Sequence, residues 1–145
     1  MKNILIINGP NLNLLGKREQ EVYGKNTLEQ IRIECEKAGL ELNIKINFFQ
    51  SNNEGEIINK IHEVEQCYDG LIINPAAFTH SSIAILDALK AIKKPKVEIH
   101  LSNIYSREDY RKKSITSEGV DGLICGFGGN SYILGIEAIA KLIYN

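Results

Sequence analysis

Two pairs of side chains have the types and the spacing that proton transfer to a small molecule requires. Arg18 and Tyr23 share one polar stretch, and Glu98 and His100 share an apolar run. A tyrosine phenol has a pKa of about 10, and lowering it to about 7 requires about 4 kcal/mol. One guanidinium about 4 Å away supplies about that amount at an effective dielectric constant of 20. Arg18 could therefore make Tyr23 a tyrosinate base, although a solvated loop fits the same residues.

Glu98 and His100 are separated by one residue, and side chains at this spacing point to the same face of a strand. Glu98 can hold one imidazole nitrogen while the other faces a substrate, which fixes the tautomer and favours the protonated acid form. A buried histidine whose hydrogen bond to a carboxylate is purely structural would show the same pattern. The position of His100 at the end of the run favours the catalytic interpretation.

Two further segments could bind a carboxylate through backbone N–H groups. Residues 74–82 include His80 and lead into a helix with a serine cap. Leu101 and Ser102 follow the Glu98 run and offer backbone amides and a hydroxyl. Ordinary turns fit both segments equally well. The glycine-rich residues 126–129 lack the spacing of a dinucleotide-binding loop and predict a tight turn.

Five apolar runs rich in β-branched residues predict the strands that carry these side chains. Helical patterns lie between most of them, and the first opens with a capping box of Thr27 and Gln30 and ends near Gly39. The charged residues 106–114 predict a short helix. The expected strands are residues 4–7, 44–49, 71–73, 97–101 and 120–125, and the expected main helices lie at 27 to about 42, around 57–64, at 82–92 and at 131–144.

Strands that alternate with helices predict a parallel sheet covered on both faces. Five strands in 145 residues favour a single α/β domain over residues 1–145, with a flavodoxin-like doubly wound sheet in the order 2-1-3-4-5. Ligands of such sheets bind beyond the carboxyl ends of the strands. This edge suits a neutral, polyhydroxylated or carboxylated small molecule, because the side chains expected there are amides, hydroxyls and one imidazole: Asn8, Asn11, Gln50, Ser51, Asn52, Asn74, His100, Ser102 and Asn103.

The connection between the first strand and the helix at Thr27 is longer than the usual 2–6 residues. Long connections in small domains often serve as lids or binding loops. Gly16 and Gly24 stand at the two ends of its charged half. The segment of about residues 16–25 is therefore expected to be a hinged lid that carries reactive side chains.

Subunit contacts are expected at two helices. Asp87 interrupts an otherwise apolar helix, and a lone carboxylate on such a face usually has a partner, which could belong to another subunit. The last helix, residues 131–144, is apolar almost all round, which favours burial between subunits over a free surface.

Composition excludes several classes of function. The net charge is −1 and no cluster of basic residues stands out, so a nucleic-acid partner is not expected. No apolar run approaches the ~18 residues of a membrane span, and no secretory signal opens the chain, so a cytoplasmic protein is expected. Cys35, Cys67 and Cys125 lie far apart without metal-ligand spacing, and we expect no metal site and interpret them as small core residues.

Taken together, several segments resemble the type II 3-dehydroquinate dehydratases. The resemblance runs from Ile6 to about Tyr132 and is carried by residues 8–19, 23–24, 50–52, 74–80 and 98–103. It implies a flavodoxin-like fold, anti elimination of water from 3-dehydroquinate through an enolate, a homododecamer, and no cofactor or metal. The chain departs from the usual pattern of the family at Gln20, Leu86, Tyr105-Ser106 and residues 116–121.

The resemblance also implies roles for individual residues. Tyr23 would take the C2 proton with help from Arg18 on the lid, and Asn11 would hold a water that stabilises the enolate. His100, oriented by Glu98, would protonate the departing C1 hydroxyl. The remaining roles concern binding and assembly: Asn74, His80 and Arg111 for the ring hydroxyls, Leu101 and Ser102 for the carboxylate, Asp87 for a neighbouring subunit's site, and Arg107 for the lid and the subunit contact.

Two other functions use the same fold. A flavodoxin-like flavin-binding module needs a hydroxyl-rich phosphate loop after the first strand, and residues 8–17 contain no serine or threonine. A receiver-like signalling domain needs an acidic pocket there, and residues 8–13 contain no carboxylate. Both are therefore less favoured than the dehydratase.

Overall fold

A five-stranded parallel sheet forms the centre of the computed structural model, which describes residues 1–144. The strand order is β2-β1-β3-β4-β5, as predicted. The strands are β1 (Lys2–Asn8), β2 (Ile44–Gln50), β3 (Gly70–Asn74), β4 (Lys96–His100) and β5 (Gly122–Cys125). The fifth strand begins two residues later than predicted, because Thr116–Gly119 forms a 3₁₀ turn that Val120 caps.

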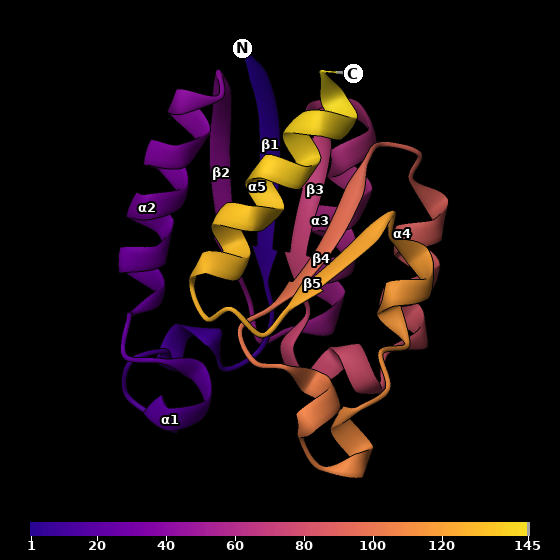
Figure 1. Cartoon of the computed structure of the whole chain (residues 1–145). Coiled ribbons are helices and arrows are strands. Elements are labelled where there is room, and N and C mark those ends of the chain that lie inside the picture. The colour runs from indigo at the N-terminus through magenta and orange to yellow at the C-terminus, as the bar shows by residue number, and fades with distance from the viewer. Residues whose placement is uncertain (145) are drawn as a thin grey trace.

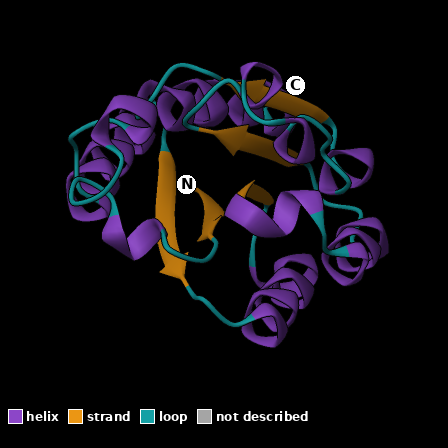
Figure 2. Ribbon diagram, turned by 90° about the horizontal axis from the view of Figure 1, so that it is seen from below, coloured by secondary structure: helices purple, strands orange, loops and turns teal. Residues whose placement is uncertain are grey.

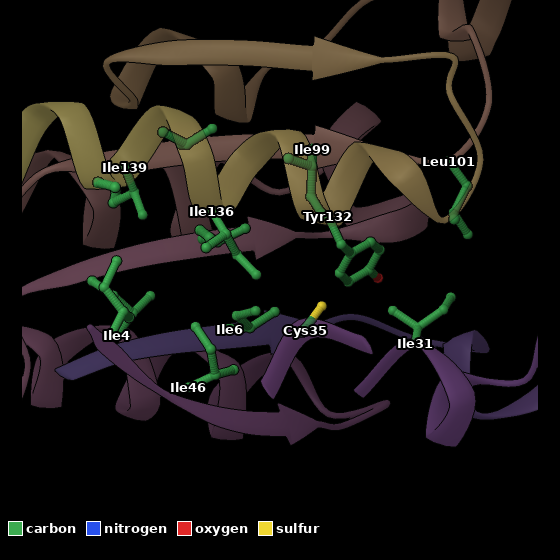
Figure 3. Close-up of a cluster of buried hydrophobic side chains, with 14 of the residues drawn as sticks. Ile4, Ile6, Ile31, Cys35, Ile46, Ile99, Leu101, Tyr132, Ile136 and Ile139 are labelled. Carbon is green, nitrogen blue, oxygen red and sulfur yellow. The ribbon is translucent and has the colours of Figure 1, made fainter. Parts of the chain in front are cut away.

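Helices cover both faces of the sheet (Figure 1). One face packs on α2 (Leu28–Glu41) and α5 (Asn130–Ile143), and the other packs on α3 (Glu54–Cys67) and α4 (Ile83–Ala91). Successive strand residues alternate between the two cores, since β-strand side chains point to opposite faces. Figure 3 shows the first core, where Ile4 and Ile6 of β1 lie opposite Ile136 of α5.

The first main helix starts and ends close to the predicted residues, but Gly39 does not terminate it. Its capping box forms, because the Gln30 N–H donates to Thr27 Oγ1 over 3.2 Å and the Thr27 N–H donates to Gln30 Oε1 over 2.9 Å. The helix continues past Gly39 to Glu41. A Cβ at Gly39 would lie 2.7 Å from a side-chain atom of Ile46, so this glycine allows α2 to approach β2 closely.

The cysteines are not all core residues. Cys35 is fully buried in the first core, Cys125 is half-buried and Cys67 is exposed. Burial raises the pKa of the Cys35 thiol to about 12. Within residues 1–144, no helix is long and apolar enough to cross a lipid bilayer.

Two irregular segments lie beyond the carboxyl ends of the strands, at the lower end of Figure 1 and facing the viewer in Figure 2. The expected lid contains a short helix, α1 (Gln20–Tyr23), after a 3₁₀ turn at Leu12–Leu14. The second segment joins β4 to β5. The short helix predicted at 106–114 is replaced there by separate 3₁₀ turns at Ile104–Ser106 and Asp109–Arg111.

Candidate active site

A cavity of about 300 Å³ lies at this end of the sheet, between the lid and the β4–β5 connection. Its walls bring together side chains that are far apart in the sequence. Ten of the residues singled out from the sequence line it: Asn11, Arg18, Tyr23, Asn74, His80, His100, Leu101, Ser102, Arg107 and Arg111.

The phenol of Tyr23 lies among three arginines. Arg107 Nη2 donates to Tyr23 Oη over 3.2 Å, and Arg111 Nη1 donates to it over 3.5 Å. The Arg18 guanidinium lies over the ring instead, 4.9 Å from its centroid, and pairs with Glu19 at 2.6 Å. Sequence reasoning placed one guanidinium beside the phenol and chose Arg18, whereas the hydrogen bonds to the oxygen come from the β4–β5 connection.

Glu108 is a functional candidate that sequence reasoning missed. Its carboxylate pairs with Arg107 Nε at 3.4 Å and with Arg111 Nε at 3.3 Å. A hydrogen bond from its own backbone N–H and another from the Tyr110 hydroxyl lower the pKa of Glu108 to about 2. This carboxylate therefore stays ionised and offsets part of the positive charge that faces Tyr23.

The predicted contact between Glu98 and His100 is confirmed. His100 Nε2 lies 2.7 Å from Glu98 Oε2, and the two side chains are 6% and 0% exposed. The other ring nitrogen, Nδ1, is left for the cavity that His100 lines. Glu98 also accepts hydrogen bonds from Ser114 and Thr116, which sequence reasoning did not single out.

A buried chain of amides and a phenol fixes Asn74 at the end of β3. Asn74 Nδ2 donates to Tyr132 Oη over 3.2 Å, and Tyr132 Oη donates to Asn8 Oδ1 over 2.5 Å. Burial raises the pKa of the Tyr132 phenol, which therefore stays neutral. The Ala76 N–H donates to Asn74 Oδ1 over 3.1 Å. Asn8 lies at the predicted sheet edge, but nothing in the sequence indicated that a tyrosine of the last helix would reach it.

Of the remaining predicted residues, Asn11, His80 and Ser102 line the cavity, and Asp87 does not. Asn11 adopts a left-handed conformation with φ 69°, which asparagine tolerates, and its N–H donates to Asn52 Oδ1. His80 Nδ1 lies 2.8 Å from the Lys113 carbonyl oxygen. Ser102 Oγ accepts from Arg107 Nη1 over 3.1 Å. Asp87, in contrast, lies on the exposed side of α4 and does not line the cavity of its own chain.

Of the segment 74–82 that could bind a carboxylate, the loop lines this cavity but the serine cap of α4 does not. Ser82 caps the helix by accepting from the Ile85 N–H, and its hydroxyl donates to Glu54 Oε2 over 2.5 Å. The lining of the cavity reaches His80 but not Ser82. In the part of the chain that the structure describes, no group of three or more histidines, cysteines or carboxylates could hold a metal ion.

The geometry suits paired acid and base chemistry. A phenol whose oxygen accepts from two guanidiniums and an imidazole backed by a buried carboxylate line one small cavity. A base and an acid on one ligand are what an elimination requires, because a proton leaves one atom while a leaving group on its neighbour is protonated.

Comparison with known proteins agrees with this geometry. The family described as "Dehydroquinase class II" matches residues 2–140. The chain is 58% identical over 139 residues to a 3-dehydroquinate dehydratase of Clostridium botulinum, covering 96% of this chain and 95% of the relative. It is 51% identical over 142 residues to that of Thermoanaerobacter pseudethanolicus, covering 98% of this chain and 96% of the relative.

Solved structures give the same result. The type II dehydroquinase from Propionibacterium acnes has a TM-score of 0.94 at 38% identity, over 97% of each chain. That from Butyrivibrio crossotus has a TM-score of 0.93 at 42% identity, over 95% of this chain and 97% of the other. The sheet order, the sequence identity and the matched span agree, and the chain belongs to the class II dehydroquinase family.

Proposed function

We propose that the cavity removes water from 3-dehydroquinate by anti elimination through an enolate, with Tyr23 as the base and His100 as the acid. The activity itself, 3-dehydroquinate dehydratase, follows from membership of the family. The observation that carries the assignment of roles is that the Tyr23 phenol and the His100 imidazole line the same cavity. We also propose that no cofactor or metal takes part, because the ring ketone of the substrate already acidifies the C2 proton.

Tyr23 acts as a phenolate in this scheme. The two guanidiniums that donate to its oxygen place positive charge and hydrogen-bond donors beside the atom that carries the negative charge. The Arg18 guanidinium covers one face of the ring and adds a favourable cation–π contact. The phenolate removes the C2 proton, and the negative charge passes to the ketone oxygen of the enolate. Asn11, fixed through its backbone to Asn52, holds the water that stabilises this oxygen.

His100 completes the elimination. Its Nε2 is engaged with Glu98, so Nδ1 donates the proton to the departing C1 hydroxyl. The buried carboxylate holds the ring in place during this step. After the step, the neutral ring keeps its hydrogen on Nε2, and water leaves.

The substrate is held from both sides of the cavity. Asn74, His80 and Arg111 bind ring hydroxyls, and the backbone amides of Leu101 and Ser102 bind the carboxylate. Arg107 donates both to Ser102 Oγ and to Tyr23 Oη, so it links the carboxylate site to the base. This position supports a role for Arg107 inside the site in addition to ordering the lid of residues 16–25 and the subunit contact.

We propose a homododecamer in which Asp87 reaches the cavity of a neighbouring copy, as the family resemblance implies. Ile83, one turn before Asp87 on α4, is 63% exposed, and Leu134 and Leu142 of α5 are 37% and 46% exposed. Apolar surface of this kind suits burial between copies. The free thiols, among them exposed Cys67, suit a reducing compartment, and we propose the cytoplasm.

The assignment of the base is tested by Tyr23→Phe. The variant keeps the ring but has no phenolate, so we expect kcat to fall by at least about a thousandfold while substrate binding survives. The rate is read from the enone absorbance of dehydroshikimate, and binding is measured by calorimetry. Tyr105→Phe, at an exposed tyrosine outside the cavity, is the control. Near-normal turnover by Tyr23→Phe would show that another group is the base.

A further inference from the structure

The carboxylate of Glu98 receives more hydrogen bonds than its contact with His100 explains. Its side chain is 0% exposed. Oε2 accepts from His100 Nε2 at 2.7 Å and from Ser114 Oγ at 2.8 Å. Oε1 accepts from Thr116 Oγ1 at 2.5 Å. A hydroxyl carries a single hydrogen, and both of these hydrogens are directed at the carboxylate.

The two hydroxyls are held in place by the backbone around them. Ser114 Oγ accepts from the Ser117 N–H over 3.0 Å, so its own hydrogen is free to point at Glu98. The Ile115 N–H donates to the Thr79 carbonyl oxygen over 2.9 Å, which ties the segment to the turn after β3. Thr116 is fully buried. The donors are therefore preorganised and do not have to be recruited from solvent.

A carboxylate that faces an imidazolium at 2.7 Å inside a protein can take the proton from it. The pair then has two forms with the same number of protons: carboxylate with imidazolium, or neutral acid with neutral imidazole. Hydrogen-bond donors to the carboxylate stabilise the first form, because they favour the ionised state of the group that they contact. Only the first form allows Nδ1 to give up a proton and leave a neutral imidazole behind.

No other carboxylate contacts His100 among the described residues. In the sheet, Cys125 of β5 lies opposite His100 in register. Lys96, at the other end of β4, donates to backbone carbonyls. The charged and titratable groups that share the cavity with His100 are Arg18, Tyr23, His80, Arg107, Tyr110 and Arg111.

We infer that Ser114 and Thr116 are positioning residues for the acid: they keep Glu98 ionised and turned toward Nε2, so that the proton stays on His100. The inference rests on the proposed role of His100. The structure also assigns a second task to the β4–β5 connection. Through Arg107 and Arg111 it supplies donors to the base, and through these two hydroxyls it supplies donors to the partner of the acid.

The test removes the hydroxyls one at a time with little change of shape. Thr116→Val and Ser114→Ala each delete one donor, and Thr116→Ser keeps it. Thr79→Val is the matched control, because Thr79 Oγ1 is equally buried beside the same segment and has no hydrogen-bond partner among residues 1–144. We expect Thr116→Val to lower kcat about tenfold or more with KM within about twofold, and Thr116→Ser to restore it. Thr79→Val should leave kcat near wild type.

A spectroscopic readout separates positioning from a merely structural role. The chain has three histidines, so the ring nitrogens can be followed by NMR after ¹⁵N-histidine labelling, with His100 assigned by its absence in His100→Gln. In the absence of substrate, the ¹⁵N signals of the His100 ring should move away from their wild-type positions in Thr116→Val, and further in the double variant with Ser114→Ala. Thr116→Ser and Thr79→Val should keep the wild-type spectrum.

Other outcomes would overturn the inference. Wild-type ring signals in a folded Thr116→Val would refute it, whatever happens to the rate. Equal losses of kcat in Thr116→Val and Thr79→Val would show that Thr116 acts only through packing. If His100→Gln retained turnover, the proposed mechanism would fail, but the ligand-free NMR spectrum would still decide whether the hydroxyls control the charge of Glu98 and His100.

Discussion

Replacing Arg107 by methionine should weaken Tyr23, the proposed base, without removing it. The change keeps most of the aliphatic stem but deletes the donor that lies 3.2 Å from Tyr23 Oη. Two opposite charges about 4 Å apart contribute about 4 kcal/mol at an effective dielectric constant of 20. The Arg107 side chain is only 14% exposed, so solvent screens little of this, but its contact with Glu108 at 3.4 Å offsets a part. We therefore expect a net loss of about 1.5–3 kcal/mol of preference for the phenolate.

This loss has a definite sign in the pH profile. A guanidinium favours the charged, active form of the base, so without it the base becomes protonated at a higher pH. The acidic limb of kcat should move up by about one to two pH units, and kcat at a pH on that limb should fall about ten- to a hundredfold. KM should also rise, because Ser102 Oγ loses a donor.

The assay is kcat against pH, read from the enone absorbance, with Arg32→Met as the matched control. Arg32 pairs with Glu29 and Glu36 of α2 and does not line the cavity, so its removal should leave the profile unchanged. An acidic limb that moves by less than about 0.3 pH units in Arg107→Met would refute the electrostatic role of this arginine.

Three further predictions follow from contacts described above. Glu108→Gln removes a carboxylate that is ionised above about pH 2, so the positive charge near the base grows and the acidic limb of kcat should move down by less than about one unit; an upward shift contradicts this. Gly39→Ala forces a Cβ against β2 and should lower the free energy of unfolding by about 1–3 kcal/mol in urea titrations, whereas Gly122→Ala, with open space around it, should not. Tyr132→Phe leaves the buried amides of Asn8 and Asn74 without this partner, so the free energy of unfolding should fall by about 1–3 kcal/mol. The variant should also raise KM more than it lowers kcat. An unchanged KM would show that the Tyr132 phenol does not orient Asn74 for substrate binding.

Much of the fold could be predicted from the sequence because it depends on patterns that repeat. Apolar strands between amphipathic helices determine the layers, and chirality limits the connections that remain. The roles of individual residues were predicted less reliably. Gly39 looked like a helix terminator, since glycine is common there, but its small size serves the packing of α2 on β2. That reason involves residues from another element and has no local signature.

In the candidate site, too, the contacts set by regular secondary structure could be predicted and those made by loops could not. The contact of Glu98 with His100 was predictable, because strand geometry alone brings them to one face. The arrangement around Tyr23 was not, since three arginines reach it from two loops and loop residues have no periodicity that indicates their direction. The hydroxyls on Glu98 were missed for the same reason: isolated serines and threonines in a connection resemble any solvated turn.

The link from Asn8 through Tyr132 to Asn74 has a consequence for the order in which a working molecule is completed during synthesis. Both asparagines belong to strands that are made early, but the phenol that joins them lies on the last helix. Domains generally fold as units, and a chain whose synthesis has passed β3 but has not reached α5 lacks this phenol. Such a chain has the two amides and their hydrogen bonds to the Phe49 carbonyl oxygen and the Ala76 N–H, but it does not have the phenol that links them. The hydrogen-bond chain that orients Asn74 is therefore completed only when α5, which follows all five strands in the sequence, has packed on the sheet.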